Sequence, residues 1–163
     1  RDRMDGLYAI KSTTLAIYGP PSARKCLKLG DFGLAKDGVT EAASGAKSIC
    51  GTPEYMAPEI MRADTVAYTN VVDWWSLGCL TSELLTGTTP FNRAGPDVPT
   101  LLRMILWDPI TVPTHPHVGP LERDFIMALL QRNPSARLGG QGHTAVLAHP
   151  WFLPTTVGVG VGD

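Results

Sequence analysis

The order of apolar and polar residues along the chain predicts one short strand and several helices. Residues 26–29, CLKL, alternate between apolar and polar side chains, as a strand with one buried face does. Residues 71–86, VVDWWSLGCLTSELLT, are apolar nearly all round a helix, which predicts a buried helix at the centre of the domain. Gly87 and Pro90 supply the stop signals expected after its end.

Two more helices are expected in the second half of the chain. Residues 101–106 carry apolar side chains at helical spacing, after a polar loop at residues 92–99. Residues 121–130 repeat the same spacing and stop shortly before a proline. Residues 12–25 contain the turn sequence GPPS and are interpreted as a linker.

Composition places these elements in one globular domain and excludes several classes of partner. The 163 residues are 44% hydrophobic, which suffices for one packed core. A net charge of -1 predicts no nucleic-acid or membrane-surface partner. The three cysteines are an odd number without C-x-x-C spacing, so we expect a reducing compartment, the cytoplasm or the nucleus. Because the chain starts without methionine, we interpret it as part of a longer product or as an incomplete gene model.

Several motifs bracket a loop that is rich in small and polar residues. GDFG at 30–33 and APE at 57–59 resemble the two ends of a protein-kinase activation segment. With CGTPEY at 50–55 and VDWWSLG at 72–78, they resemble the AGC group of Ser/Thr kinases, and most closely the ribosomal S6 kinases. The joint match is far more specific than any triplet alone.

The resemblance implies a fold and a division of the chain. The family fold is α+β, and this chain would be its mainly α-helical C-terminal lobe with the activation segment. Residues 145–152, AVLAHPWF, resemble the last helix of that lobe. The expected divisions are a poorly matched segment at 1–26 with an N-lobe strand remnant at 7–11, a partial kinase domain at 27–153, and a tail at 154–163.

The implied activity is ATP-dependent transfer of a phosphoryl group to protein Ser or Thr, with ATP and Mg²⁺ as cofactors. Asp31 would bind the metal, since a hard dication prefers carboxylate oxygen. Lys11 would contact the ATP phosphates, although an ordinary strand ending in a solvated lysine fits equally well. Ser48 matches an activating phosphosite, so an upstream activating kinase is implied, while a plain loop hydroxyl stays open.

Further residues match positions that face the substrate or hold the lobe together. Thr52 would approach the catalytic aspartate, and Glu83 would recognise an arginine upstream of the phosphoacceptor, implying protein substrates with basic residues near Ser or Thr. As an alternative, Glu83 is a solvated helix carboxylate. Glu59 would pair with Arg137 as a structural contact.

The catalytic loop H-R-D-x-x-x-x-N is not found between Lys11 and Asp31, so no catalytic base is assigned. If Asp2 were the base, Met4 and Leu7 would stand in the positions of the family's lysine and asparagine, whose roles they cannot fill. We therefore expect the chain to be inactive alone and Asp73 to lack its family partner, at a cost of ~1–3 kcal/mol. The alternatives are a non-catalytic binding module and an unstable splice or gene-model fragment.

Overall fold

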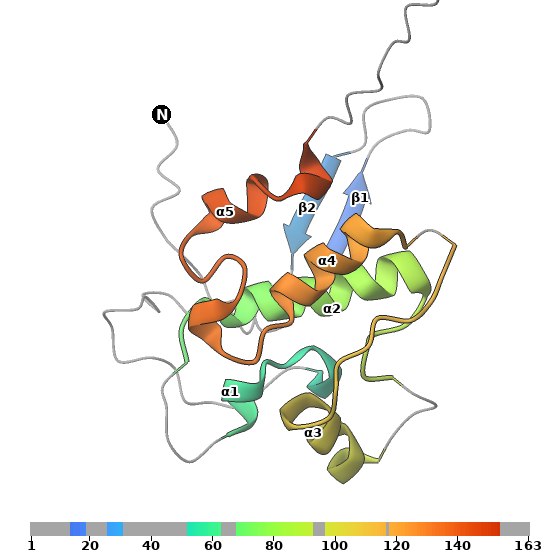
Figure 1. The fold of residues 1–163 in the computed structure, drawn as a ribbon, viewed down its shortest axis with the longest axis vertical. Helices are drawn as coiled ribbons and strands as arrows, with labels where there is room; N and C mark the ends of the chain where they lie inside the picture. The colour runs from blue at the N-terminus through green and yellow to red at the C-terminus, as the bar shows by residue number, and fades with distance from the viewer. Residues whose placement is uncertain are drawn as a thin grey trace, which may run out of the picture.

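The computed structural model describes residues 14–18, 26–30, 52–62, 68–92, 97–116 and 118–153 (Figure 1). In chain order the elements are β1 (Thr14–Tyr18), β2 (Cys26–Gly30), the 3-10 helix η2 (Pro53–Tyr55), α1 (Pro58–Met61), α2 (Val72–Thr86), α3 (Val98–Leu106), α4 (Pro120–Leu129), the 3-10 helix η3 (Pro134–Ala136), α5 (His143–Leu147) and the 3-10 helix η4 (Pro150–Phe152). Helices α2 and α4 pack together at the centre, and α1 packs against α3 (Figure 1).

The two strands form an antiparallel pair that ends directly before Asp31. Thr14 lies opposite Gly30 and Tyr18 lies opposite Cys26. The strand predicted at 26–29 is therefore confirmed as β2, but the interpretation of residues 12–25 as a linker is wrong for β1. Thr14–Tyr18 carries β-branched and aromatic residues that favour a strand, and the GPPS sequence follows this strand in the chain.

Helix α2 confirms the predicted core helix to within one residue. Trp75 and Cys79 are fully buried, and Gly87 ends the helix with φ 79°, which glycine adopts without strain. The helix is not buried all round, however, because Leu84 is 69% exposed near its C-terminal end. On the inner face, Gly78 lies so close to Leu130 that a Cβ would meet it at 2.9 Å, which lets α4 approach.

Helix α3 begins at Val98, three residues before the start expected from the apolar pattern. Asp97 caps it by accepting a hydrogen bond of 2.9 Å from the backbone N–H of Thr100. Hydrogen bonds from the side chain and then the backbone of Thr100 also lower the pKa of Asp97. Pro99 fits in the first turn because its missing N–H is not needed there.

The C-terminal end is divided into two short helices instead of the one expected at 145–152. Helix α5 ends at Leu147, and η4 starts at Pro150. His149 has extended backbone angles, φ -62° and ψ 138°, because the residue before a proline is disfavoured in a helix. Helix α4, by contrast, lies where its apolar spacing predicted it.

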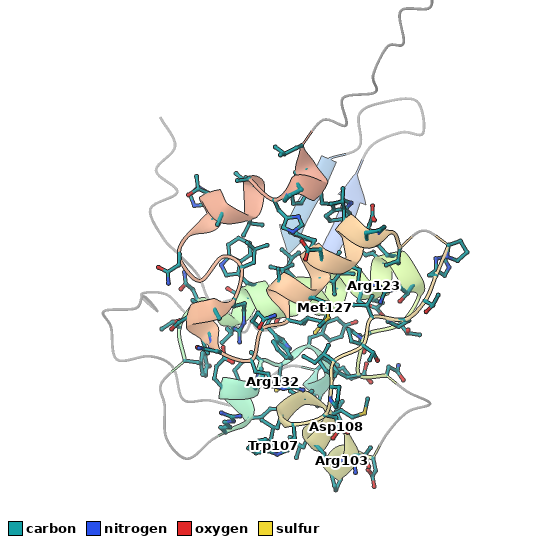
Figure 2. All side chains as sticks on the ribbon, in the orientation of Figure 1. Arg103, Trp107, Asp108, Arg123, Met127 and Arg132 are labelled. Atoms are coloured by element: carbon teal, nitrogen blue, oxygen red, sulfur yellow. The ribbon has the colours of Figure 1, made fainter. Side chains whose placement is uncertain are left out.

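Two clusters of buried side chains hold the helices together. The larger one joins α1, α2, α3 and α4, and within it Trp75 stacks on Phe91 with ring centroids 5.7 Å apart. The smaller one joins Phe125 and Leu129 of α4 to Val146 of α5. The side chains described by the structure interdigitate between the helices around both clusters (Figure 2).

Candidate functional site

Residues 52–62 form a segment that lies along the side of the helical core, and we call this segment the shelf. Thr52 and Pro53 are exposed at its start, whereas Met56, Ala57 and Ile60 are buried under it. The shelf thus presents its first residues to solvent and anchors its second half in the larger apolar cluster.

The exposed end of the shelf is attached to α2 through two contacts. The hydroxyl of Tyr55 donates a hydrogen bond of 2.5 Å to Oε2 of Glu83. The hydroxyl of Ser76 donates one of 2.9 Å to the backbone oxygen of Tyr55. Ser76 and Glu83 are seven residues apart on α2, which places them on one face of the helix, so the two contacts hold Tyr55 along that face.

The buried end of the shelf is held by Arg137. Its guanidinium donates hydrogen bonds of 2.7 and 2.9 Å to the two carboxylate oxygens of Glu59. It also donates to the backbone oxygens of Val71 and Gln131, each at 2.9 Å. The guanidinium carbon lies 5.4 Å from the centroid of the Trp75 ring. The Arg137 side chain is fully buried and cannot bind water. The hydrogen bonds of this network replace the hydrogen bonds to water that the cation loses on burial.

Burial and charge shift two titrating groups beside the shelf. Burial, followed by the hydrogen bond to Glu83 and its charge, raises the pKa of Tyr55 well above its usual range, so the phenol remains a donor. Burial also raises the pKa of the Cys79 thiol, which therefore packs as a small apolar side chain and is unsuited to be a nucleophile.

The structure brings some of the predicted residues together. Glu59 contacts Arg137, as the resemblance implied, and Glu83 is half-buried against Tyr55 instead of fully solvated. Thr52 is exposed at the free end of the shelf. Asp73 does not lack an interaction partner, so the expectation of an unsatisfied carboxylate there is wrong.

The predicted residues Lys11, Asp31 and Ser48 lie outside the described residues. Two functional neighbours were missed by sequence reasoning, namely Tyr55 and Ser76. The seven-residue spacing of Ser76 and Glu83 was the available signal, because it predicts that both face the same segment.

Within the described ranges, no helix is long and apolar enough to span a bilayer. The same part of the chain gathers no group of three or more His, Cys, Asp or Glu side chains that would hold a metal ion.

Comparison with known families matches residues 19–152 to the protein kinase domain. The chain belongs to this family, which confirms the resemblance and the prediction of a mainly helical C-terminal lobe. The match starts at residue 19, whereas the boundary expected from sequence lay between residues 26 and 27. The family generally uses ATP and Mg²⁺.

Several curated Ser/Thr kinases of the AGC group are similar to the chain. Ribosomal protein S6 kinase alpha-4 of Homo sapiens is 43% identical over 129 residues, covering 76% of this chain and 16% of the relative. Serine/threonine protein kinase ypkA of Aspergillus fumigatus is 40% identical over 126 residues, covering 77% and 19%. RAC-beta serine/threonine-protein kinase of Rattus norvegicus is 38% identical over 129 residues, covering 78% and 25%. The chain thus spans a quarter or less of the length of each of these relatives.

Proposed function

We propose that the chain is the substrate-facing lobe of a Ser/Thr protein kinase, similar to the ribosomal S6 kinases, that transfers the γ-phosphoryl group of ATP to a protein hydroxyl. The observation that carries the proposal is the shelf at residues 52–62, which is pinned by Glu83 at one end and by Arg137 at the other. Phosphoryl transfer depends on positioning, and a shelf fixed at both ends supplies a rigid support for a peptide.

In this proposal each substrate-facing residue has one task. Thr52 lies at the exposed end of the shelf, where it would contact the substrate next to its phosphoacceptor residue. Glu83 would bind an upstream basic residue of the substrate. Its Oε2 accepts the Tyr55 hydrogen bond, which orients the carboxylate and leaves Oε1 for an incoming cation.

The nucleotide side of the proposal rests on the sequence. ATP supplies the phosphoryl group, and Mg²⁺ neutralises its charge when bound. Asp31, which directly follows β2, offers a carboxylate for the metal, and Lys11 offers an ammonium for the phosphates. The chain contains no H-R-D-x-x-x-x-N stretch to orient the nucleophile.

The experiment that tests the substrate site is a peptide-binding titration. A peptide with arginine two and three residues before serine should bind the chain, and Glu83→Gln should weaken the binding about twofold to fivefold, the range for one exposed ion pair. Asp124→Asn, which removes a carboxylate from α4, is the matched control and should leave the affinity unchanged. Equal affinity of the Glu83→Gln variant and the native chain would refute this role.

A second assay concerns catalysis by the 163-residue chain itself. Because no catalytic base is present in the sequence, we expect no phosphate incorporation into the same peptide from Mg²⁺ and labelled ATP. Incorporation that disappears in the Asp31→Ala variant would show that the chain is active alone and that another residue serves as the base.

The missing catalytic loop also favours a second candidate function, a non-catalytic binding module that docks proteins through Glu83 and α3. This candidate predicts peptide binding that does not change when ATP and Mg²⁺ are added. An affinity that depends on nucleotide would count against it and in favour of the catalytic proposal.

Regulation and location follow from the same proposal. Ser48 would accept a phosphate from an upstream activating kinase, which adds about two negative charges. The arginine of H-R-D, which pairs with such a phosphate in the family, is not in this sequence. The compartment would be the cytoplasm or the nucleus. Incubation with a candidate activating kinase, followed by mass spectrometry of the native chain and of Ser48→Ala, tests the phosphosite.

A further inference from the structure

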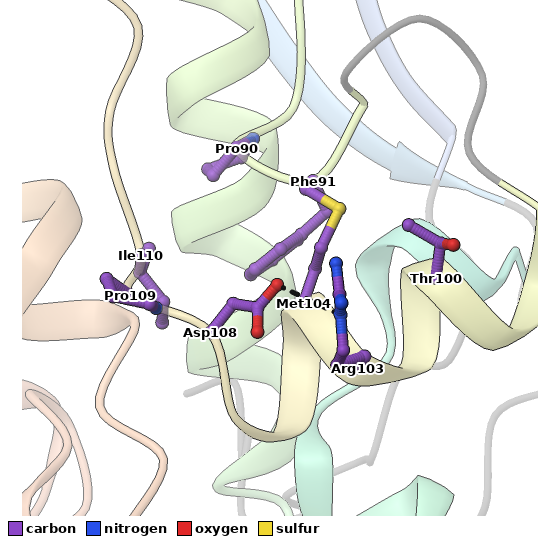
Figure 3. Close-up of a pocket in the computed structure, with 8 residues that line it drawn as sticks. All are labelled: Pro90, Phe91, Thr100, Arg103, Met104, Asp108, Pro109 and Ile110. Carbon is purple, nitrogen blue, oxygen red and sulfur yellow. Dashed lines mark ion pairs between the residues drawn. The ribbon is translucent and has the colours of Figure 1, made fainter.

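A cavity of about 190 Å³ opens beside α3, and no residue of the shelf at 52–62 lines it (Figure 3). Its apolar lining comes from Phe91, Met104 and Ile110, of which Phe91 and Met104 are buried in the core. A cavity of about 150 Å³ already accepts a benzene ring when its walls are apolar. This cavity therefore has room for one large aliphatic or aromatic side chain.

One wall of the cavity is charged. Nε of Arg103 lies 3.3 Å from Oδ2 of Asp108, and the two side chains are 65% and 37% exposed (Figure 3). The Arg103 side chain is 65% exposed, and a guanidinium offers a planar fork of donors that can bind a carboxylate with two parallel hydrogen bonds.

The surface continues beyond the cavity along the C-terminal end of α3. Trp107 is 69% exposed and directly follows the last residue of α3, four residues after Arg103; both are labelled in Figure 2. The guanidinium carbon of Arg62 lies 5.2 Å from the centroid of the Trp107 ring. Tryptophan and arginine are the residues that most often carry the binding energy of protein interfaces.

The charges around the cavity favour an anionic partner. Arg62 and Arg103 are exposed cations. They face two carboxylates, namely Asp108, which pairs with Arg103 and lines the cavity, and the exposed Asp97, whose pKa the charge of Arg103 helps to lower. Arg132 adds a third positive charge behind Asp108, where it donates a hydrogen bond to the backbone oxygen of that residue. An acidic segment thus meets a surplus of positive charge, whereas a basic one meets repulsion.

We propose that this surface, made of the cavity and of Arg62, Arg103 and Trp107, binds an acidic segment of a partner protein. The partner inserts one aromatic or large aliphatic side chain between Phe91 and Met104 and places a neighbouring carboxylate on Arg103. The proposal rests on the binding function of α3 described above and is independent of phosphoryl transfer and of Glu83.

The probes are three fluorescently labelled peptides of equal length, titrated against the full 163-residue chain by anisotropy. The first has a central phenylalanine flanked by glutamates, the second has lysines in place of the glutamates, and the third has alanine in place of the phenylalanine. We expect the first to bind about twofold to fivefold more tightly than the lysine peptide, as one exposed ion pair provides. It should bind at least about tenfold more tightly than the alanine peptide, because that peptide lacks the buried side chain.

Reversing the charge of Arg103 tests whether this residue binds the glutamates of the peptide. Arg103→Glu should reverse the preference between the glutamate and lysine peptides, and Arg103→Gln should reduce it. Both variants should fold, because the Arg103 side chain is exposed and its ion pair with Asp108 lies at the surface, and circular dichroism checks this. Glu83→Gln is the control that separates this surface from the substrate site, and it should leave the affinity for the glutamate peptide unchanged.

Three results would overturn the proposal. The first is equal binding of the glutamate and lysine peptides by the native chain. The second is a loss of binding in Glu83→Gln that Arg103→Glu does not share, because the peptide would then occupy the substrate site. The third is sedimentation evidence for a dimer that Arg103→Glu dissociates, because the surface would then hold a second copy of this chain.

Discussion

Arg137 and Glu59 are 78 residues apart in sequence and form a bidentate ion pair with hydrogen bonds of 2.7 and 2.9 Å. The Arg137 side chain is fully buried and that of Glu59 is 14% exposed. Glu59 opens α1, and Arg137 follows η3, so the pair ties the shelf at 52–62 to the far end of the chain. Its function is to hold a surface in place, since the guanidinium binds both carboxylate oxygens of Glu59 and two backbone oxygens of the core.

Replacing Arg137 with methionine should destabilise the chain by about 3–5 kcal/mol, because the carboxylate of Glu59 would remain buried without its cation. Two backbone oxygens, those of Val71 and Gln131, would lose a donor as well. Urea unfolding followed by tryptophan fluorescence measures the change. Arg103→Met is the matched control, and removing its exposed ion pair should cost less than about 1 kcal/mol. Similar losses in the two variants would contradict the prediction.

Arg132 joins the end of α4 to the end of α3, and we predict that lysine cannot replace it (Figure 2). Its guanidinium donates to the backbone oxygens of Ile105 at 2.7 Å, Met104 at 2.9 Å and Asp108. The carbonyls of Met104 and Ile105 belong to the last turn of α3 and have no partner within the helix, and that of Asp108 follows the helix end. A lysine ammonium keeps the charge but lacks the planar fork, so Arg132→Lys should cost about 1–3 kcal/mol.

The location of that loss can be measured by hydrogen exchange. In Arg132→Lys, amides of α3 should exchange faster than in the native chain, while those of α2 should be protected as before. Uniformly faster exchange in both helices would mean that Arg132 supports the whole core and not specifically the end of α3.

Gly139 and Gly87 offer a comparison between a steric clash and backbone strain alone. Both have positive φ, 91° and 79°. A Cβ on Gly139 would lie 2.5 Å from the indole of Trp74, whereas one on Gly87 would meet nothing within 4 Å. Gly87→Ala should therefore cost about 1–2 kcal/mol from the left-handed backbone, and Gly139→Ala should cost clearly more. Equal melting temperatures of the two variants would show that Trp74 can move aside.

The helices could be predicted from the sequence because their apolar spacing is local information. Helix α2 was predicted to within one residue, but the start of α3 was not, since Asp97 as a cap extends it beyond its apolar residues. Strand β1 was missed because the neighbouring turn residues suggested a linker across the whole segment. The spacing of apolar residues indicates the type of an element and which of its faces is buried. It indicates less well at which residue the element begins.

The site was less predictable for a different reason. The contact between Glu59 and Arg137 was expected only because the motifs around both residues resemble a family. The contact between Tyr55 and Glu83 and the three carbonyls bound by Arg132 were not foreseen. Each of these contacts joins segments more than 20 residues apart in sequence. In addition, every residue has a backbone carbonyl, so the sequence does not indicate which carbonyls accept a hydrogen bond from a side chain.

His149 should carry its ring proton on Nε2. Its Nδ1 accepts a hydrogen bond of 3.2 Å from the backbone N–H of Trp151, so Nδ1 carries no proton. Nε2 lies 3.2 Å from Oδ2 of Asp124 and is the donor in that contact. Nitrogen NMR of labelled histidine distinguishes the two tautomers, and His149→Asn, which can still cap η4, should retain more stability than His149→Ala. A signal from a proton on Nδ1 would contradict the assignment.

Tyr55 should make the stability of the chain depend on alkaline pH. Because burial and Glu83 raise the pKa of Tyr55 above its value in the unfolded chain, the folded state holds this proton more tightly. The resulting stability is complete below about pH 10, the ordinary pKa of tyrosine, and falls as the pH rises above it. The free energy of unfolding of the native chain should therefore drop more between pH 9 and about 11 than that of Tyr55→Phe. Parallel pH profiles would show that folding does not raise the pKa of this phenol, whereas converging profiles assign the loss of stability to its ionisation.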